Sequence, residues 1–319
     1  MDLSIVTTLY YSARHLNDYY VRMTAAARQV TDDYEIILVD DGSPDESLQI
    51  ALEIFKSDPR VKIIDLSRNF GQHKAAMTGL AHARGDLVFV IDSDLEEDPE
   101  LLTPFHAELH QAQADVVFGV RANRRSNFFE RVTGELFYRL FNLLSDFPVA
   151  ANVVNARLMT RRYVDQLVKH REREPFMLGL WTITGFKQVP MAVVKHAKGS
   201  STYTLRRKIA MFVNSVTSFS KKPLILVFYL GCVISAVSAA AVAYLSIRRI
   251  FFGVYLEGWP SLIASTWLLG GIMIFCLGVI GIYIANIFSE VKERPYTVVR
   301  HVYEHESQSD VRSIGVSFA

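Results

Sequence analysis

The chain has 319 residues, of which 50% are hydrophobic and 21% charged, and 34 basic against 33 acidic side chains leave a net charge of +1. This balance argues against a globally basic nucleic-acid binder and against an acidic disordered chain, so we expect no nucleic-acid partner. Two cysteines are too few for a disulfide scaffold or a Cys-rich zinc module. The length suggests about two domains, with ample chain for a large core.

Residues 1–203 are predicted to form one α/β domain, because short β-rich runs alternate with helical stretches. We expect strands at Leu3–Leu9, Glu35–Val39, Val61–Asp65, Leu87–Ile91 and Val116–Val120. The helices expected between them are Asp18–Val30, Asp45–Lys56, Gln72–Ala83 and Glu100–Gln113. This order predicts a mainly parallel sheet covered by helices, whose ligands bind beyond the carboxyl ends of the strands.

The first of two acidic clusters contains Asp40 and Asp41, between the apolar run EIILV and a predicted helix. These carboxylates would lie at the end of the sheet, where they could accept hydrogen bonds from a nucleotide base and ribose. A tight turn at Gly42, followed by a helix cap at Asp45, explains the same residues equally well. The cluster alone therefore leaves both interpretations open.

The second cluster follows the apolar run LVFVI and begins with Asp92 and Asp94. Strand alternation places both carboxylates on one side, where they repel each other unless a cation or a shared proton intervenes. A divalent ion, Mg²⁺ or Mn²⁺, held together with substrate phosphates would meet this requirement. The alternative is a solvated acidic loop, but the position after a second strand of the βαβ series favours a metal site.

Two uncharged runs near the C-terminus, between Lys222 and Arg248 and between Glu257 and Glu290, are each long enough to cross a bilayer as a helix. We expect residues 223–289 to form a hairpin of two transmembrane helices, at about 223–247 and 262–288. Lys and Arg residues flank the hairpin on the side of its termini, so the positive-inside rule places both termini in the cytoplasm. Residues 290–319 are expected to form a cytoplasmic tail.

Two further stretches have apolar residues at helical spacing. Residues 204–222 carry them beside cations just before the first predicted span, which predicts an amphipathic helix in the membrane interface. Asn127–Ser145 carries a similar Phe- and Leu-rich pattern. For that second stretch, the membrane surface and the core of the domain are equally good partners.

Several motifs together resemble those of family 2 glycosyltransferases with the GT-A fold. They read VDDGSPDES, LSRNFGQHKAAMTGLAHARGDLVFVIDSDLEEDPELL and FGVRANRR, and the likeness continues through FERVTGELFYRLFNLLSD, RLMTRR, GSSTY and EVKERPY. Their order is similar to that in polyprenyl-phosphate glycosyltransferases, such as dolichol-phosphate mannose synthase and undecaprenyl-phosphate sugar transferases. The resemblance implies a multi-pass enzyme of the bacterial inner membrane with a cytoplasmic catalytic domain. Such an enzyme moves a sugar from a nucleotide-sugar donor to polyprenyl phosphate with inversion and releases a nucleoside diphosphate.

The resemblance also implies roles for individual positions. The residues expected to bind the nucleotide sugar are Thr8, Tyr10, Asp40, Asp41, Asp92 and Ser93. Those expected to hold Mg²⁺ or Mn²⁺ are Asp92, Asp94 and Glu96, and those expected to act in catalysis are Asp94, Arg121 and Arg131. The lipid phosphate is expected at Arg131, Ser201, Tyr203 and Arg206, since a guanidinium fork matches phosphate oxygens.

The chain departs from the family pattern at three positions: Ser12 stands in place of Glu, Asn155 in place of Asp, and Thr202 in place of Lys. Asn155 cannot act as a base. A hydroxyl acceptor would need a base, whereas a lipid phosphate, with a second pKa of about 6, would already be ionised and would not. The pattern therefore favours a phosphate acceptor. Two alternatives stay open: transfer to a hydroxyl of a lipid-linked glycan, and a catalytically silent membrane scaffold, against which Asp92 and Asp94 argue. The sugar, the nucleotide base, the lipid length and the formation of a homo-oligomer are also left open.

Overall fold

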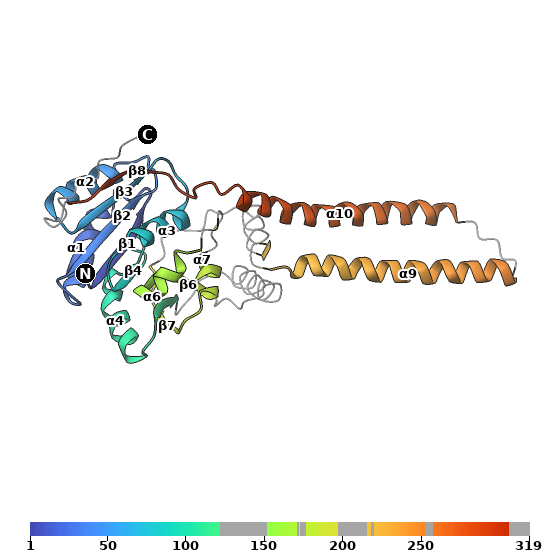
Figure 1. The fold of residues 1–319 in the computed structure, drawn as a ribbon, viewed down its shortest axis with the longest axis horizontal. Helices are drawn as coiled ribbons and strands as arrows, with labels where there is room; N and C mark the ends of the chain where they lie inside the picture. The colour runs from blue at the N-terminus through green and yellow to red at the C-terminus, as the bar shows by residue number, and fades with distance from the viewer. Residues whose placement is uncertain are drawn as a thin grey trace, which may run out of the picture. The chain divides into compact units, whose positions relative to one another are not determined.

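The computed structural model of the protein describes residues 1–121, 152–170, 172, 177–196, 216–217, 220–252 and 258–305 (Figure 1). The chain divides into two compact units. The first comprises Met1–Ser126, Ala150–Ser201 and Pro295–Ala319, and the second comprises Asn127–Val149 and Thr202–Arg294. Each unit is described by itself below.

The first unit is built on one eight-stranded sheet with the order β7-β5-β6-β4-β1-β2-β3-β8. Its parallel centre consists of β4 (Leu87–Val90), β1 (Leu3–Leu9), β2 (Tyr34–Asp40) and β3 (Val61–Leu66). Every residue of β2 and β3 is buried, as expected for parallel strands covered on both faces. All four strands lie within one residue of the predicted bounds, so this part of the prediction is confirmed.

Between these strands lie α1 (Leu16–Arg28), α2 (Ser47–Ser57) and α3 (Gln72–His82), and α4 (Leu102–Gln111) follows β4; all four helices were predicted. Helix α3 packs on one face of the sheet so closely that a Cβ at Gly79 would collide with Val6 and Val39. The alternate side chains of the same strands, such as Ile5 and Ile36, join residues of α1, α2 and α4 in the main hydrophobic core. Helices therefore cover both faces of the sheet, and its strand ends stay free for a site.

The sheet continues beyond β4 through elements that only partly follow the predicted series. The strand β6 (Val153–Thr160) runs antiparallel to both β4 and β5 (Val116–Arg121), and β7 (Gln188–Val193) pairs parallel to β5. The short helices α6 (Arg161–Leu167) and α7 (Met177–Ile183) lie between β6 and β7 in the chain. Because Val90 pairs with Arg157, the antiparallel register carries Asn155 toward Asp92.

The C-terminal residues expected as a separate tail, 290–319, instead give the sheet its eighth strand. The strand β8 (Val299–Tyr303) pairs antiparallel with β3, where Ile63 lies opposite Tyr303. Two buried charges on β3 explain this return: Lys62 forms an ion pair with Glu304 at 3.1 Å, and Asp65 forms one with Arg300 at 3.3 Å. Buried charges are rarely left unpaired, so Arg300 of β8 and Glu304 just after it supply the counter-charges that the β3 edge requires.

The second unit contains two long helices, α9 (Lys222–Phe252) and α10 (Trp259–Val291), which lie side by side in Figure 1. Within α10, Ser265–Val291 is long and apolar enough to cross a membrane. Its mean hydropathy is 2.5, and none of its most apolar stretch is buried in the structure. In α9 the described apolar stretch, Lys222–Ser238, is shorter. The hairpin of two spans therefore stays a prediction. The amphipathic helices predicted at Asn127–Ser145 and 204–222 lie almost wholly outside the described residues.

Candidate active site

The first acidic cluster lies at the end of β2, where its two carboxylates have different surroundings. The side chain of Asp41 accepts hydrogen bonds from the backbone N–H groups of Phe70 (2.7 Å) and Gly71 (3.0 Å), and so holds the loop before α3. Asp40 is 2% exposed, and its Oδ1 has no hydrogen-bond partner among the described residues. Burial raises the pKa of Asp40 to about 6, and the negative charge of Asp65 adds to this shift. Asp40 is therefore a buried acceptor below the end of the sheet.

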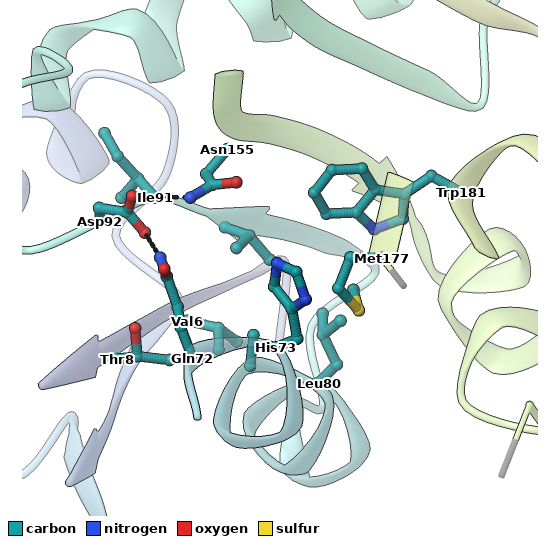
Figure 2. A pocket seen from close by; sticks show the side chains of 12 residues that line it. Val6, Thr8, Gln72, His73, Leu80, Ile91, Asp92, Asn155, Met177 and Trp181 are labelled. Atoms are coloured by element: carbon teal, nitrogen blue, oxygen red, sulfur yellow. Dashed lines mark hydrogen bonds between the residues drawn. The ribbon is translucent and has the colours of Figure 1, made fainter. Parts of the chain in front are cut away.

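The second cluster lies at the end of β4, where Asp92 is held by two side-chain amides (Figure 2). Gln72 Nε2 donates to Asp92 Oδ1 at 2.6 Å, and Asn155 Nδ2 donates to Asp92 Oδ2 at 2.8 Å. Burial raises the pKa of Asp92 to about 6, and the negative charge of Glu97 adds to the shift. Residues from two elements, α3 and β6, thus fix the orientation of this carboxylate at the end of β4.

The residues after Asp94 link the end of β4 to β6 and to the residues after β7. Glu97 is fully buried, and its two oxygens accept the backbone N–H groups of Asn155 (3.2 Å) and Ala156 (2.7 Å). Lys195 Nζ lies 3.2 Å from Glu96 Oε2 and 3.4 Å from Glu97 Oε1. Glu96, expected as a metal ligand, is therefore ion-paired with Lys195, and its metal-binding role stays a prediction.

Two adjoining hollows, which we call the outer cleft and the inner recess, open beside these carboxylates. The outer cleft has a volume of about 240 Å³ and is lined by Thr8, Tyr10, Tyr11, Ser12, Asp41, Asn69, Gln72, Asp92, Ser93 and Asp94. The inner recess is much smaller, about 20 Å³, and shares Thr8, Gln72 and Asp92 with the cleft (Figure 2). Both hollows lie within the first unit.

The outer cleft brings together most of the residues expected to bind a nucleotide sugar: Thr8, Tyr10, Asp41, Asp92 and Ser93 all line it, together with Asp94. Ser12, where the family pattern has Glu, shares a hydrogen bond of 2.8 Å with Ser93 and so supports this wall. Arg121 ends β5 and lines neither hollow. The remaining expected residues, Arg131, Ser201, Tyr203 and Arg206, lie outside the described residues.

Comparison with known proteins identifies the family. A family model described as glycosyl transferase family 2 matches residues 6–168. The chain belongs to this family. A protein of Mycobacterium tuberculosis (strain CDC 1551 / Oshkosh) named "putative glycosyltransferases" is 55% identical to this glycosyltransferase, over 95% of this chain and 89% of its own length. The prophage bactoprenol glucosyl transferase homolog of Escherichia coli K12 is 32% identical, over 95% of this chain and 99% of its own.

Among solved structures, glucosyl-3-phosphoglycerate synthase from Mycobacterium tuberculosis in complex with Mn²⁺, uridine diphosphate and glucosyl-3-phosphoglycerate is 19% identical. It aligns with a TM-score of 0.48 over 68% of this chain and 77% of that chain. The family model and these relatives confirm the predicted family and the assignment as a glycosyltransferase, and the described sheet confirms the α/β fold expected for a GT-A domain.

The chemistry of the carboxylates bears on the expected metal ion. Among the described residues, no group of three or more His, Cys, Asp or Glu side chains could hold an ion by itself. Mg²⁺ and Mn²⁺ are, however, commonly bound through one or two carboxylates and the oxygens of substrate phosphates. Asp92 and Asp94 line a cleft with room for such phosphates. The donor set therefore fits an ion shared with a bound diphosphate.

Gln72 and Trp181 were not predicted as residues of the site, and neither were the contacts of Glu97 and Lys195. Gln72 stood only at the start of a predicted helix, although a polar residue after the loop RNFG and near a strand end was a usable signal. Glu97 and Lys195 are joined by the fold across 98 residues of chain, so no local pattern indicated their pairing. Trp181 lies in α7, a helix that was not predicted.

Proposed function

We propose that this glycosyltransferase moves a sugar from a nucleotide-sugar donor to a polyprenyl phosphate, giving a polyprenyl-phosphate sugar and a nucleoside diphosphate. The observation that carries the proposal is the extent of the likeness to the bactoprenol glucosyl transferase homolog. It covers 95% of this chain, too much to be confined to the sheet domain. Bactoprenol is a polyprenol, and an acceptor of this kind lies in a membrane, which agrees with the apolar segment Ser265–Val291.

In this proposal the outer cleft receives the nucleoside diphosphate. Asp41 on the cleft wall and the buried Asp40 offer acceptor oxygens at the end of β2, and Tyr10, 48% exposed, offers a ring for stacking. Asp92 and Asp94 would hold the divalent ion. When bound, that ion supplies Lewis-acid stabilisation of the leaving diphosphate. Gln72 and Asn155 keep Asp92 oriented for this role.

The surroundings of Asn155 support a phosphate acceptor. Its amide donates to Asp92 and has no basic atom that could take a proton from a hydroxyl. A lipid phosphate is largely dianionic above its second pKa, about 6 by analogy with phosphoserine, so it needs positioning and no base. One of its oxygens attacks the anomeric carbon while the bond from that carbon to the diphosphate oxygen breaks, with inversion. Because Arg121 lines neither hollow, we assign it, together with Arg131, Ser201, Tyr203 and Arg206, to the phosphate of the lipid acceptor.

The topology of the sheet supports two membrane crossings. Strand β8 belongs to the same sheet as β7, so the chain must cross a membrane an even number of times between these strands. If α10 crosses, a second segment must cross as well, and α9 is the described candidate. The multi-pass topology then has the catalytic domain and both termini in the cytoplasm.

Reporter fusions test this topology. A reporter fused after Tyr303 should be cytoplasmic, and a reporter inserted within residues 253–257 should be external. Finding both reporters on the same side of the membrane would contradict the hairpin.

The test of the reaction is mass analysis of lipid products after the full chain is incubated with mixed nucleotide sugars and polyprenyl phosphate. We expect one product heavier than the acceptor by a single sugar residue, and none with Asp94→Asn. A parallel incubation offers a lipid-linked glycan with a free hydroxyl. Transfer to that hydroxyl without transfer to polyprenyl phosphate would select the alternative acceptor, and no turnover in any incubation would favour a silent scaffold.

A further inference from the structure

The inner recess contains a buried hydrogen-bond donor that no described residue satisfies. Its inner wall is apolar and includes Ala76, Leu80, Ile91 and Met177. The indole of Trp181 lines the same wall, and the residue is 7% exposed. Its Nε1 has no hydrogen-bond partner among the described residues. A buried N–H group without a partner is costly and uncommon, so a ligand atom that accepts from it is the natural explanation.

The fold holds this indole in place. The guanidinium carbon of Arg157 lies 2.9 Å from the centre of the indole ring, and Arg157 is itself fully buried. The backbone carbonyl of Trp181 accepts from Tyr163 Oη at 2.9 Å and from Gln188 Nε2 at 2.6 Å. Figure 2 shows the indole, His73 and Met177 facing the same space beside Asp92 and Asn155. The N–H group is therefore preset before any ligand arrives.

The place of the recess identifies the part of the donor that would reach it. The recess and the outer cleft share Thr8, Gln72 and Asp92, so a sugar attached to a diphosphate in the cleft lies at the mouth of the recess. We propose, on the basis of the function given above, that the recess receives the exocyclic hydroxymethyl group of a hexopyranose. In this arrangement its oxygen accepts a hydrogen bond from Trp181 Nε1, which makes Trp181 a specificity-determining residue.

Size and polarity select this group over others. The recess is far smaller than the outer cleft, about 20 Å³ against about 240 Å³, so it suits a small substituent better than a sugar ring. The hydroxymethyl group projects one bond farther from the ring than the ring hydroxyls do, so it reaches deeper. Its methylene suits Leu80 and Met177, while its oxygen suits the indole N–H. The carboxylate of a uronic acid would instead meet the negative charges of Asp92 and Asp94 at the mouth.

Two pairs of nucleotide-sugar donors, each differing at a single group of the sugar, test the proposal. UDP-glucose and UDP-xylose differ only in the hydroxymethyl group, and GDP-mannose and GDP-rhamnose differ in its oxygen. Calorimetric titration of the full chain in detergent with Mn²⁺ and without acceptor should give a 10- to 100-fold preference for the complete hexose, about the range for a lost pocket group. Trp181→Phe should reduce the preference to less than about threefold and leave the affinity for the nucleoside diphosphate unchanged.

Two further variants keep the test decisive. Trp267→Phe removes an exposed indole from α10 and should keep the full preference. Ala76→Val narrows the recess and should reverse the preference in the glucose–xylose pair, even if Trp181→Phe were to unfold. Equal affinities within each pair for the natural chain, or no binding of either hexose, would overturn the proposal. Because no acceptor is present, this failure is distinct from failure of the lipid-product assay.

Discussion

Glu97 offers a direct test of how the ends of β4 and β6 are joined. Replacing it with Ala leaves two N–H groups without this acceptor, that of the partly buried Asn155 and that of the fully buried Ala156. An unsatisfied buried donor costs about 1–3 kcal/mol, so the pair should cost about 2–6 kcal/mol of the free energy of unfolding. The loss of the contact with Lys195 adds little, because that side chain is 25% exposed and can hydrate its charge.

The assay is thermal unfolding of the full chain in detergent, followed by tryptophan fluorescence. For a unit of this size, the loss corresponds to a fall in Tm of roughly 5–20 °C. Glu97→Gln keeps one acceptor oxygen and should lie between the natural chain and Glu97→Ala. The matched control is Glu100→Ala, which removes a half-exposed carboxylate paired with Arg22 and should cost about 1 kcal/mol or less. Equal Tm values for Glu97→Ala and Glu100→Ala would refute the reasoning.

Three other predictions concern single carboxylates or amides of the site. Burial raises the pKa of Asp40 to about 6, so the folded chain holds this proton more tightly than the unfolded chain does. The stabilisation by this proton is complete below about pH 4 and is lost as the pH rises through about 6. Asp40→Asn should therefore raise the free energy of unfolding by up to about 3 kcal/mol above pH 7 and leave it unchanged near pH 4. The measurement is Tm as a function of pH. Excess chelator should abolish transfer, and Asp94→Asn should mimic it; full activity in chelator would exclude a metal role. Asn155→Ala should slow transfer by about tenfold or less, because it removes one hydrogen bond to Asp92, whereas loss of a general base would cost about 10²–10⁴-fold.

The strands β1 to β4 could be predicted from the sequence, because their local apolar pattern agrees with their burial in the folded sheet. The strands β1 to β4 are apolar runs buried on both faces, and each is followed by a stretch with helical spacing. Strand β6 was missed because VVNARLMT combines polar and apolar residues in no regular alternation. Its Arg157 is nevertheless fully buried, since it stacks on Trp181. Such a position is defined by a partner elsewhere in the chain, which the local pattern does not reveal.

The candidate site shows the same limit. Motif spacing identified Asp41, Asp92 and Asp94, because the carboxyl ends of the parallel strands β2 and β4, which flank β1, lie at the same edge of the sheet. The amides that hold Asp92 were not identified as its partners. Asn155 reaches it only through the antiparallel register of β6 with β4. The sequence thus indicated which groups carry the chemistry, while the non-local pairing of strands decided which groups orient them.

The return of the chain at β8 connects the residues after α10 to the site more closely than a free tail would. Just before β8, Val298 accepts the backbone N–H of Ser67 at 2.9 Å, and Thr297 shares a hydrogen bond of 2.8 Å with Thr78 of α3. The first turn of α3 carries Gln72, which holds Asp92. The segment that leaves α10 is therefore joined through one helix to the carboxylate of the proposed metal site. A catalytic fragment that stops before α9 would lack these contacts as well as the counter-charges of β3, so the sheet domain is complete only in the full chain.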